Sequence, residues 1–282
     1  MRVVGPEKTA KVGKIGRPIR RIAILAADSS VLKPVQRSLG IVSEQRSEGA
    51  FSTATYKGAT VITGVTPAGL VSAQASAEAL FLRYGDSIDH LFIVAINSAF
   101  DLHLGIGEVV FPEAVVDCRD GIARYPVNPG ERDSSGVIYS SDHRQCDDDY
   151  VAALNHYDVS GVDSVTGAVA AVCDRHGCAF TVVSAVSEKM DLLAEPRDLF
   201  QLAGLPSYRS ALRFALRRPQ RIAYLIAMTL GIKKAIARAA TEVLASVESL
   251  LQQPRQHRHT GNVSTASSVR PQSAVLVEAR KG

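Results

Sequence analysis

The sequence predicts an α/β protein of three layers, in which helices cover both faces of a central mixed β-sheet. Apolar residues make up 46% of the 282 residues and charged residues 21%, the balance of a globular chain that buries a core. Aromatic residues are only 6% and tryptophan is absent, so that core must be aliphatic. Short β-branched runs alternate with Ala- and Leu-rich segments, which is typical of sheets between helices.

The first half of the chain predicts four strands and two helices. Asp28, Ser29 and Ser30 are N-cap residue types for the first helix, and Pro67 suits the start of the second. Lys57-Gly58 predicts a hairpin turn between two of the strands. The strands are expected over residues 21–27, 51–56, 59–63 and 90–96, and the helices over residues 31–39 and 70–84.

The second half predicts further strands and helices, and a polar loop over residues 119–135. Pro219 opens the first of two C-terminal helices, and the second carries apolar residues from Ile232 to Leu250. Both segments have their apolar residues at helical spacing. The strands are expected over residues 105–110, 114–116, 136–140 and 179–184, and the shorter helices over residues 151–156 and 162–176. This arrangement predicts a flexible leader over residues 1–20, one domain over 21–252 and a disordered tail over 253–282.

Charge and cysteine usage exclude several classes of function. The formal net charge is +4, and much of the excess lies near the two ends rather than on one predicted face, so no nucleic-acid partner is expected. The four cysteines form no Cys-x-x-Cys pair, so we expect free thiols in a reducing compartment, no metal site and no cofactor. The longest apolar run, residues 222–232, is too short to span a bilayer, and no secretory signal is recognisable. We expect a cytoplasmic protein without a membrane partner.

Ligand sites in sheets of this kind lie beyond the carboxyl ends of the strands. Small and polar residues follow several of the predicted strands. These strand ends are Ala26–Ser30, Thr63–Pro67, Ile96–Phe100, Ser140–Gln145 and Ser187–Glu188.

Six segments carry a family resemblance between about residue 20 and residue 252. They are residues 22–27, 63–67, 92–99, 104–110, 162–170 and 180–188. In order and spacing they resemble the nucleoside phosphorylase superfamily, which includes purine and uridine phosphorylases, methylthioadenosine/S-adenosylhomocysteine nucleosidases and futalosine hydrolases. Residues 96–101 are similar to the family's Thr-Gly-Ser-Ala-Gly-Gly turn, residues 162–165 to Val-Asp/Glu-Met-Glu, and residues 184–188 to Arg-x-Ile-Ser-Asp.

The resemblance implies a role for each site residue. Glu188 matches the aspartate that protonates the leaving purine, and Asp28 lies near the place of the glutamate that activates water. Ser164 and Val165 match the Met-Glu pair that binds the sugar. The remaining candidates are Gly64 and Thr66 in the phosphate or water loop, Ser98, Ala99 and Phe100 facing the sugar, and Asp142, His143 and Arg144 at the base.

The sequence departs from the family's pattern at positions that would bind the sugar or the phosphate. Val165 cannot accept a hydrogen bond from a sugar hydroxyl, and Phe100 and Asp101 stand where the family has two glycines. The usual phosphate-binding arginine is replaced by the stretch 95–97, Ala-Ile-Asn, which favours hydrolysis over phosphorolysis. Structural roles remain open, because Asp28 is also a common N-cap residue and Glu188 could be a surface carboxylate beside Lys189.

The resemblance therefore implies an enzyme of nucleoside metabolism, in the manner of purine salvage. It would hydrolyse the N-glycosidic bond of a purine-type nucleoside or thionucleoside, with phosphate as co-substrate only if it were a phosphorylase. The alternative is a regulatory pseudoenzyme that binds a nucleoside or nucleotide without turnover. A third reading is a related enzyme for an altered sugar or a lipid-linked nucleoside. The family implies a homo-oligomer, and we expect a dimer.

Overall fold

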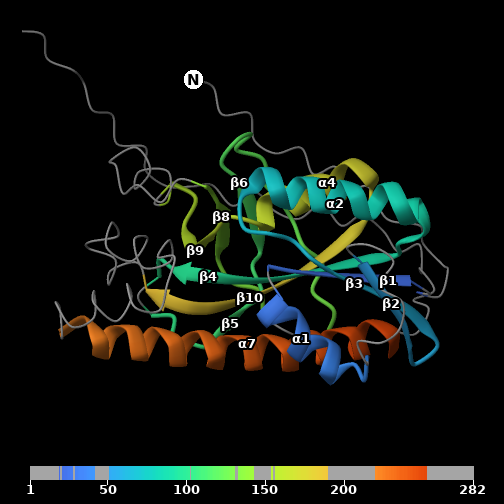
Figure 1. Ribbon diagram of the computed structural model, residues 1–282. Coiled ribbons are helices and arrows are strands. Elements are labelled where there is room, and N and C mark those ends of the chain that lie inside the picture. Colours follow the sequence, from blue (N-terminus) through green and yellow to red (C-terminus); the bar gives the residue numbers. More distant parts are fainter. Residues whose placement is uncertain are drawn as a thin grey trace, which may run out of the picture.

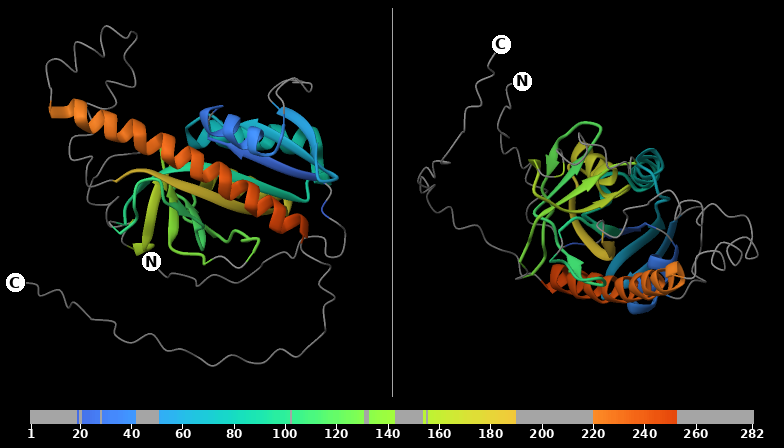
Figure 2. Two further views of the ribbon diagram at one scale, coloured as in Figure 1. Left: turned by 90° about the horizontal axis from the view of Figure 1, so that it is seen from below. Right: turned by 90° about the vertical axis from the view of Figure 1, so that its left-hand side faces the viewer.

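A single mixed sheet runs through the protein between two layers of helices (Figure 1). The computed structural model describes residues 19, 21–27, 29–41, 51–101, 103–130, 133–142, 154, 156–189 and 220–252, with the backbone alone for Asp86, Glu188 and residues 220–229. Helices α2 (Leu70–Tyr84) and α4 (Thr166–His176) cover one face of the sheet. Helices α1 (Ser29–Ser38) and α7 (Gln220–Gln252) cover the other, so the predicted three-layer α/β/α architecture is confirmed (Figure 2).

The sheet has the order β2-β3-β1-β4-β9-β8-β6-β7, and β10 pairs with both β4 and β5. Strands β1, β3, β4 and β10 are parallel to one another, so their carboxyl ends meet at one side of the molecule. Strand β9 joins β4 antiparallel. The strands are β1 (Arg21–Ala26), β2 (Phe51–Tyr56), β3 (Ala59–Val65), β4 (His90–Ala99), β5 (Val109–Val110), β6 (Ala114–Asp117), β7 (Ala123–Arg124), β8 (Val137–Ser140), β9 (Val159–Asp163) and β10 (Ala179–Lys189).

The core is aliphatic, as the composition predicts, and it lies on both faces of the central strands. In β1, Ala23 and Leu25 pack toward α2 and α4, whereas Ile22 and Ile24 pack toward α1 and α7. All four side chains are fully buried. Burial on both faces explains why β1 reads as an unbroken apolar run rather than as alternating apolar and polar residues.

Several expected element boundaries are corrected by the structure. Strand β4 continues through Ala99 and β10 through Lys189, because these two strands stay paired to their ends. Residues 105–108 form a turn, in which Glu108 N donates to Gly105 O, so only the end of that expected strand is present. Residues 162 and 163 end β9 instead of beginning a helix, since Val162 pairs with Ser98.

The two expected C-terminal helices are one continuous helix, α7. Gly231 does not end the helix. It lies against the sheet, where an added Cβ would collide with Ile106 Cγ2 and come within 3.0 Å of Ser187 O. The glycine therefore permits close packing.

The expected tail, the expected leader apart from Ile19, and most of the expected helix over 151–156 lie outside the described residues. Within the described ranges, no helix combines the length and the apolar character that crossing a membrane requires.

Candidate active site at the strand ends

The register of the two longest strands makes Ser98 and Glu188 neighbours. β10 runs parallel to β4, with Val186 opposite Asn97 and Glu188 opposite Ser98. Ser98 is 9% exposed. Two residues that are 90 positions apart in the sequence therefore meet at the carboxyl ends of adjacent strands, the place where ligands bind in sheets of this kind.

The strand end that carries Glu188 is shaped by a β-bulge at Ser187. The register between β4 and β10 shifts between Val186 and Glu188, so Ser187 is the extra residue. Its Oγ donates to Asn97 O at 3.1 Å. The preceding residue is held by Gly107 N, which donates to Val186 O at 2.7 Å, and by Glu108 O, which accepts from Val186 N at 2.8 Å. A bulge of this kind re-aims the residue that follows it.

Asn97 is a buried polar residue that the sequence reasoning did not single out. It is 2% exposed, and its Nδ2 donates to Ser184 Oγ at 2.7 Å. Gly161 makes room for it, because a Cβ there would come within 3.0 Å of Asn97 Cγ. Among the described residues, its Oδ1 has no hydrogen-bond partner. The only signal in the sequence was an amide at the end of an apolar strand.

The start of α4 is held by Asp163. Its carboxylate accepts hydrogen bonds from Ser140 Oγ, from Thr166 Oγ1, and from the backbone amides of Val165 and Thr166 at 3.2 Å each. Burial raises the pKa of the Asp163 carboxyl above its ordinary value, and these hydrogen bonds oppose the rise. The network fixes the turn that carries Ser164.

The side chain of Val165 lies in the apolar core. It is 3% exposed and belongs to the apolar cluster between the sheet and helices α2 and α4. Phe100 is half-buried and packs beside Tyr139 and Val116 in a separate small cluster. Both side chains therefore have packing roles in the structure.

The loop before α2 gathers three more candidates. Gly69 N donates to Ser164 Oγ at 3.4 Å, and the amide of Leu70 donates to Asp142 Oδ1 at 2.8 Å. A carboxylate that accepts from the first amides of a helix is an N-cap interaction, and it also complements the helix dipole. Thr66 is fully buried, and its amide donates to Ala26 O at 2.8 Å, which extends the pairing of β3 with β1.

Close packing explains why a glycine occupies position 64. A Cβ on Gly64 would lie 2.6 Å from Phe51 Cδ1 and 3.1 Å from Leu25 Cδ2. Ala99 is buried and pairs with Gly161 on β9. Strand β9 links the strand-end residues to the residues around the start of α2. Its Val162 pairs with Ser98, and Ser164 follows two residues later.

Three predicted site residues, Asp28, His143 and Arg144, lie outside the described residues. No group of three His, Cys, Asp or Glu side chains within the described ranges is placed to hold a metal ion.

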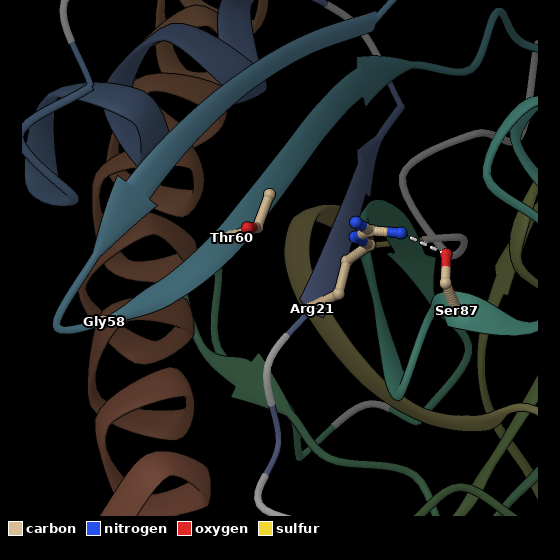
Figure 3. A pocket seen from close by; sticks show the side chains of 4 residues that line it. All are labelled: Arg21, Gly58, Thr60 and Ser87. Atoms are coloured by element: carbon tan, nitrogen blue, oxygen red, sulfur yellow. Dashed lines mark hydrogen bonds between the residues drawn. The ribbon is translucent and has the colours of Figure 1, made fainter.

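A surface hollow of about 520 Å³ lies at the opposite ends of the parallel strands. Figure 3 shows the Arg21 side chain reaching from the start of β1 toward Ser87, whose Oγ accepts a hydrogen bond from Arg21 Nη1. Thr60 and Gly58 line the other wall. Ala26, at the carboxyl end of the same strand, is about 17 Å away at the rise of an extended chain. The hollow is therefore separate from the candidate site.

The fold and the strand-end site define a class of protein, a three-layer α/β protein whose ligand site would lie at the carboxyl ends of β1, β3, β4 and β10. No family model matches the chain, and no curated protein sequence matches it. Several solved structures, however, match the fold of the chain. The 5′-methylthioadenosine/S-adenosyl homocysteine nucleosidase of Helicobacter pylori superposes with a TM-score of 0.62 at 15% identity, covering 82% of this chain and 99% of that one.

Two further structures agree. The futalosine hydrolase of Helicobacter pylori strain 26695 has a TM-score of 0.59 at 14% identity, covering 82% of this chain and 98% of its own. The nucleosidase of Colwellia psychrerythraea 34H, solved in complex with adenine, has a TM-score of 0.60 at 16% identity, covering 82% and 96%. The chain therefore has the fold of these nucleosidases and of futalosine hydrolase, as the resemblance predicted.

Proposed function

We propose that the protein is a nucleosidase that hydrolyses the N-glycosidic bond of a purine-type nucleoside or thionucleoside. The observation that carries the proposal is the pairing of Glu188 with Ser98 at the carboxyl ends of β10 and β4, within a nucleosidase fold. The solved proteins of this fold are named for cleavage of methylthioadenosine, S-adenosyl homocysteine and futalosine.

The reaction requires an acid beside the base and a nucleophile at the sugar. As the bond between C1′ and the base nitrogen breaks, its electron pair stays with the base, and the Glu188 carboxyl supplies the proton that neutralises it. Water then bonds to the cationic C1′ and loses a proton, for which we propose Asp28 as the acceptor. The carboxyl of Glu188 is regenerated from that proton, so the products are free base and free sugar.

Hydrolysis is favoured over phosphorolysis because no cation stands at the position that matches the family's phosphate-binding arginine. Residues 95–97 are Ala-Ile-Asn, and Ser184 stands beside Asn97 on β10. Neither side chain carries a charge, whereas phosphate is usually held by Arg, Lys or a run of free amides. Ser98, Ser164 and the Thr66 loop are proposed to surround the sugar, and Asp142, His143 and Arg144 the base.

A non-catalytic nucleoside-binding protein is the second candidate, and the burial of Val165 favours it. At 3% exposure within the apolar core, Val165 offers no acceptor for a sugar hydroxyl. A protein that retained the strand-end site and lost this contact would bind a nucleoside without aligning the sugar for attack.

Base release from a panel of nucleosides separates the two candidates. The panel contains 5′-methylthioadenosine, adenosine, inosine and uridine, each with and without phosphate. The enzyme reading predicts release that does not need phosphate and that Glu188→Gln abolishes. The matched control is Glu113→Gln, at an exposed glutamate just before β6, which should leave release unchanged. Binding detected by thermal shift without any release would establish the binding protein instead.

We also propose that the protein pairs with a second copy through the outer face of α2. Val71 is 73% exposed and Leu82 is 90% exposed. Ala75 and Ala79 are exposed between them at helical spacing, so the face is apolar along its length. Light scattering should give the mass of a dimer, and Ala79→Arg should give that of a monomer. A monomeric unmodified protein would contradict this pairing.

A further inference from the structure

The first two thirds of α7 combine apolar and basic residues to the exclusion of acidic ones. Residues 222–232 carry no charge, with Arg221 before them and Lys233 and Lys234 after them. No aspartate or glutamate occurs from Leu199 to Thr241, in a chain that has 28 of them. The basic residues of the same stretch are Arg209, Arg213, Arg217, Arg218, Arg221, Lys233, Lys234 and Arg238.

The described part of this segment exposes both apolar and basic side chains at the surface. Leu230 is 60% exposed, and Lys233 and Lys234 are exposed beside it. Gly231 packs inward, where an added Cβ would lie 3.0 Å from Ser187 O. This turn of α7 therefore meets Ser187 through Gly231, while Leu230, Lys233 and Lys234 are exposed to solvent. Figures 1 and 2 show the start of α7 beside the ends of β4 and β10 and running past them.

We propose that this segment of α7 binds the surface of a bilayer that contains anionic lipids. Eleven residues of helix extend about 16 Å, roughly half the thickness of the hydrocarbon core, so the segment lies in the interface rather than crossing it. A helix that joins an apolar stretch to basic residues inserts its apolar side at the level of the headgroups. The exposed Lys233 and Lys234 complement the lipid phosphates, and each contributes about fivefold to binding.

The absence of acidic residues is what selects a lipid surface as the partner. A solvated helix surface ordinarily mixes both signs of charge, as the last third of α7 does with Glu242 and Glu248. The sequence excluded a membrane partner on the ground of a spanning segment alone. A helix that lies on the membrane surface needs no spanning segment.

Vesicle sedimentation with the full chain tests the proposal. The vesicles are phosphatidylcholine alone, and an equimolar mixture of phosphatidylcholine and phosphatidylglycerol. The protein should sediment with the mixed vesicles and stay in solution with the neutral ones, and high salt should weaken the binding. Replacing both lysines, as Lys233→Glu with Lys234→Glu, removes two attractive charges and adds two repulsive ones, so binding should fall by about 25-fold or more. Leu230→Glu should also weaken it.

The matched control reverses two exposed charges elsewhere on the same helical layer. Lys33→Glu with Arg37→Glu on α1 makes the same change in net charge and should leave most of the binding intact. Circular dichroism and thermal melting establish that every variant is folded.

Three results would overturn the proposal: equal binding to both kinds of vesicle, no binding to either, or equal losses in the α1 and α7 variants. A change of oligomeric mass in Leu230→Glu with vesicle binding intact would assign the surface to a second copy instead. The readout is lipid binding alone, so its failure would leave the nucleosidase proposal untouched.

Discussion

Replacing Asp163 by alanine should remove a large part of the protein's free energy of unfolding. The change removes the acceptor of four buried hydrogen bonds, two from hydroxyls and two from the backbone amides of Val165 and Thr166. The hydroxyls can rotate toward other acceptors, but the amides cannot. A buried donor without a partner costs about 1–3 kcal/mol, so the two amides together cost about 2–6 kcal/mol. Whole domains of this kind are stable by about 5–15 kcal/mol.

The pH dependence of the same residue has a definite sign. Burial raises the folded-state pKa of the Asp163 carboxyl above its unfolded value. Its contribution to stability is therefore fully present below the ordinary aspartate pKa, about 3.9, and is lost as the pH rises through the raised folded-state value. Asp163→Asn cannot titrate. Relative to the unmodified protein, this variant should gain stability as the pH rises through that window.

Urea unfolding followed by circular dichroism measures both effects. The unmodified protein, Asp163→Ala and Asp163→Asn are compared at pH 7 and then across an acid series. Asp158→Asn is the matched control, because Asp158 is exposed and has a positive φ of 52°, which asparagine tolerates. A loss below about 1 kcal/mol in Asp163→Ala would refute the reasoning, since the donors would then have found other partners. A difference between protein and Asp163→Asn that does not vary with pH would refute the assigned sign.

Three further predictions concern other buried and capping positions. Burial lowers the pKa of His90 to about 4. The contribution of the neutral imidazole to the free energy of unfolding should therefore be fully present above pH 6.5, the ordinary pKa of histidine, and fall by about 3 kcal/mol as the pH drops toward 4. Unfolding across that range should show the loss, and His90→Gln should flatten it. Gly64→Ala would force a Cβ against Phe51 and should cost about 1–3 kcal/mol by thermal melting, whereas Gly105→Ala, whose Cβ would come no closer than 3.4 Å to a neighbour, should be nearly neutral. Asp142→Ala should cost about 0.5–2 kcal/mol by removing the cap of α2, and Asp142→Asn should retain most of the stability; equal losses in both would argue against a capping role.

Elements that local sequence determines were predicted well. The helix over residues 70–84 has the predicted bounds, because its alanines and leucines favour a helix and Gly85 follows it. The hairpin at Lys57-Gly58 was also predicted, since the turn residues specify it. In these places propensity and turn chemistry agree with the tertiary structure.

Elements that depend on distant partners were missed. Strand β9 contains two polar residues and a glycine among its five, and it is a strand because β4 and β8 lie on either side of it. Helix α7 continues through Gly231 because the sheet packs against that glycine. Neither contact can be seen in the local sequence.

The candidate site was predicted in part. The sequence placed Ser98 and Glu188 at strand ends, but their pairing depends on the Ser187 bulge, which no local pattern announces. The buried pair of Asn97 and Ser184 was missed for the same reason, since its partners lie on separate strands. The ligand-binding roles expected for Asp142 and Val165 stay predictions. What the local sequence did not reveal is that Asp142 Oδ1 accepts from the amide of Leu70 and that Val165 packs in the apolar core.

A crystal structure of the protein soaked with 5′-methylthioadenosine would show where a nucleoside binds. We expect the nucleoside at the carboxyl ends of β4 and β10, with its base beside Glu188 and its sugar beside Ser98. A nucleoside bound instead in the hollow lined by Arg21 and Thr60, at the far ends of the strands, would contradict it.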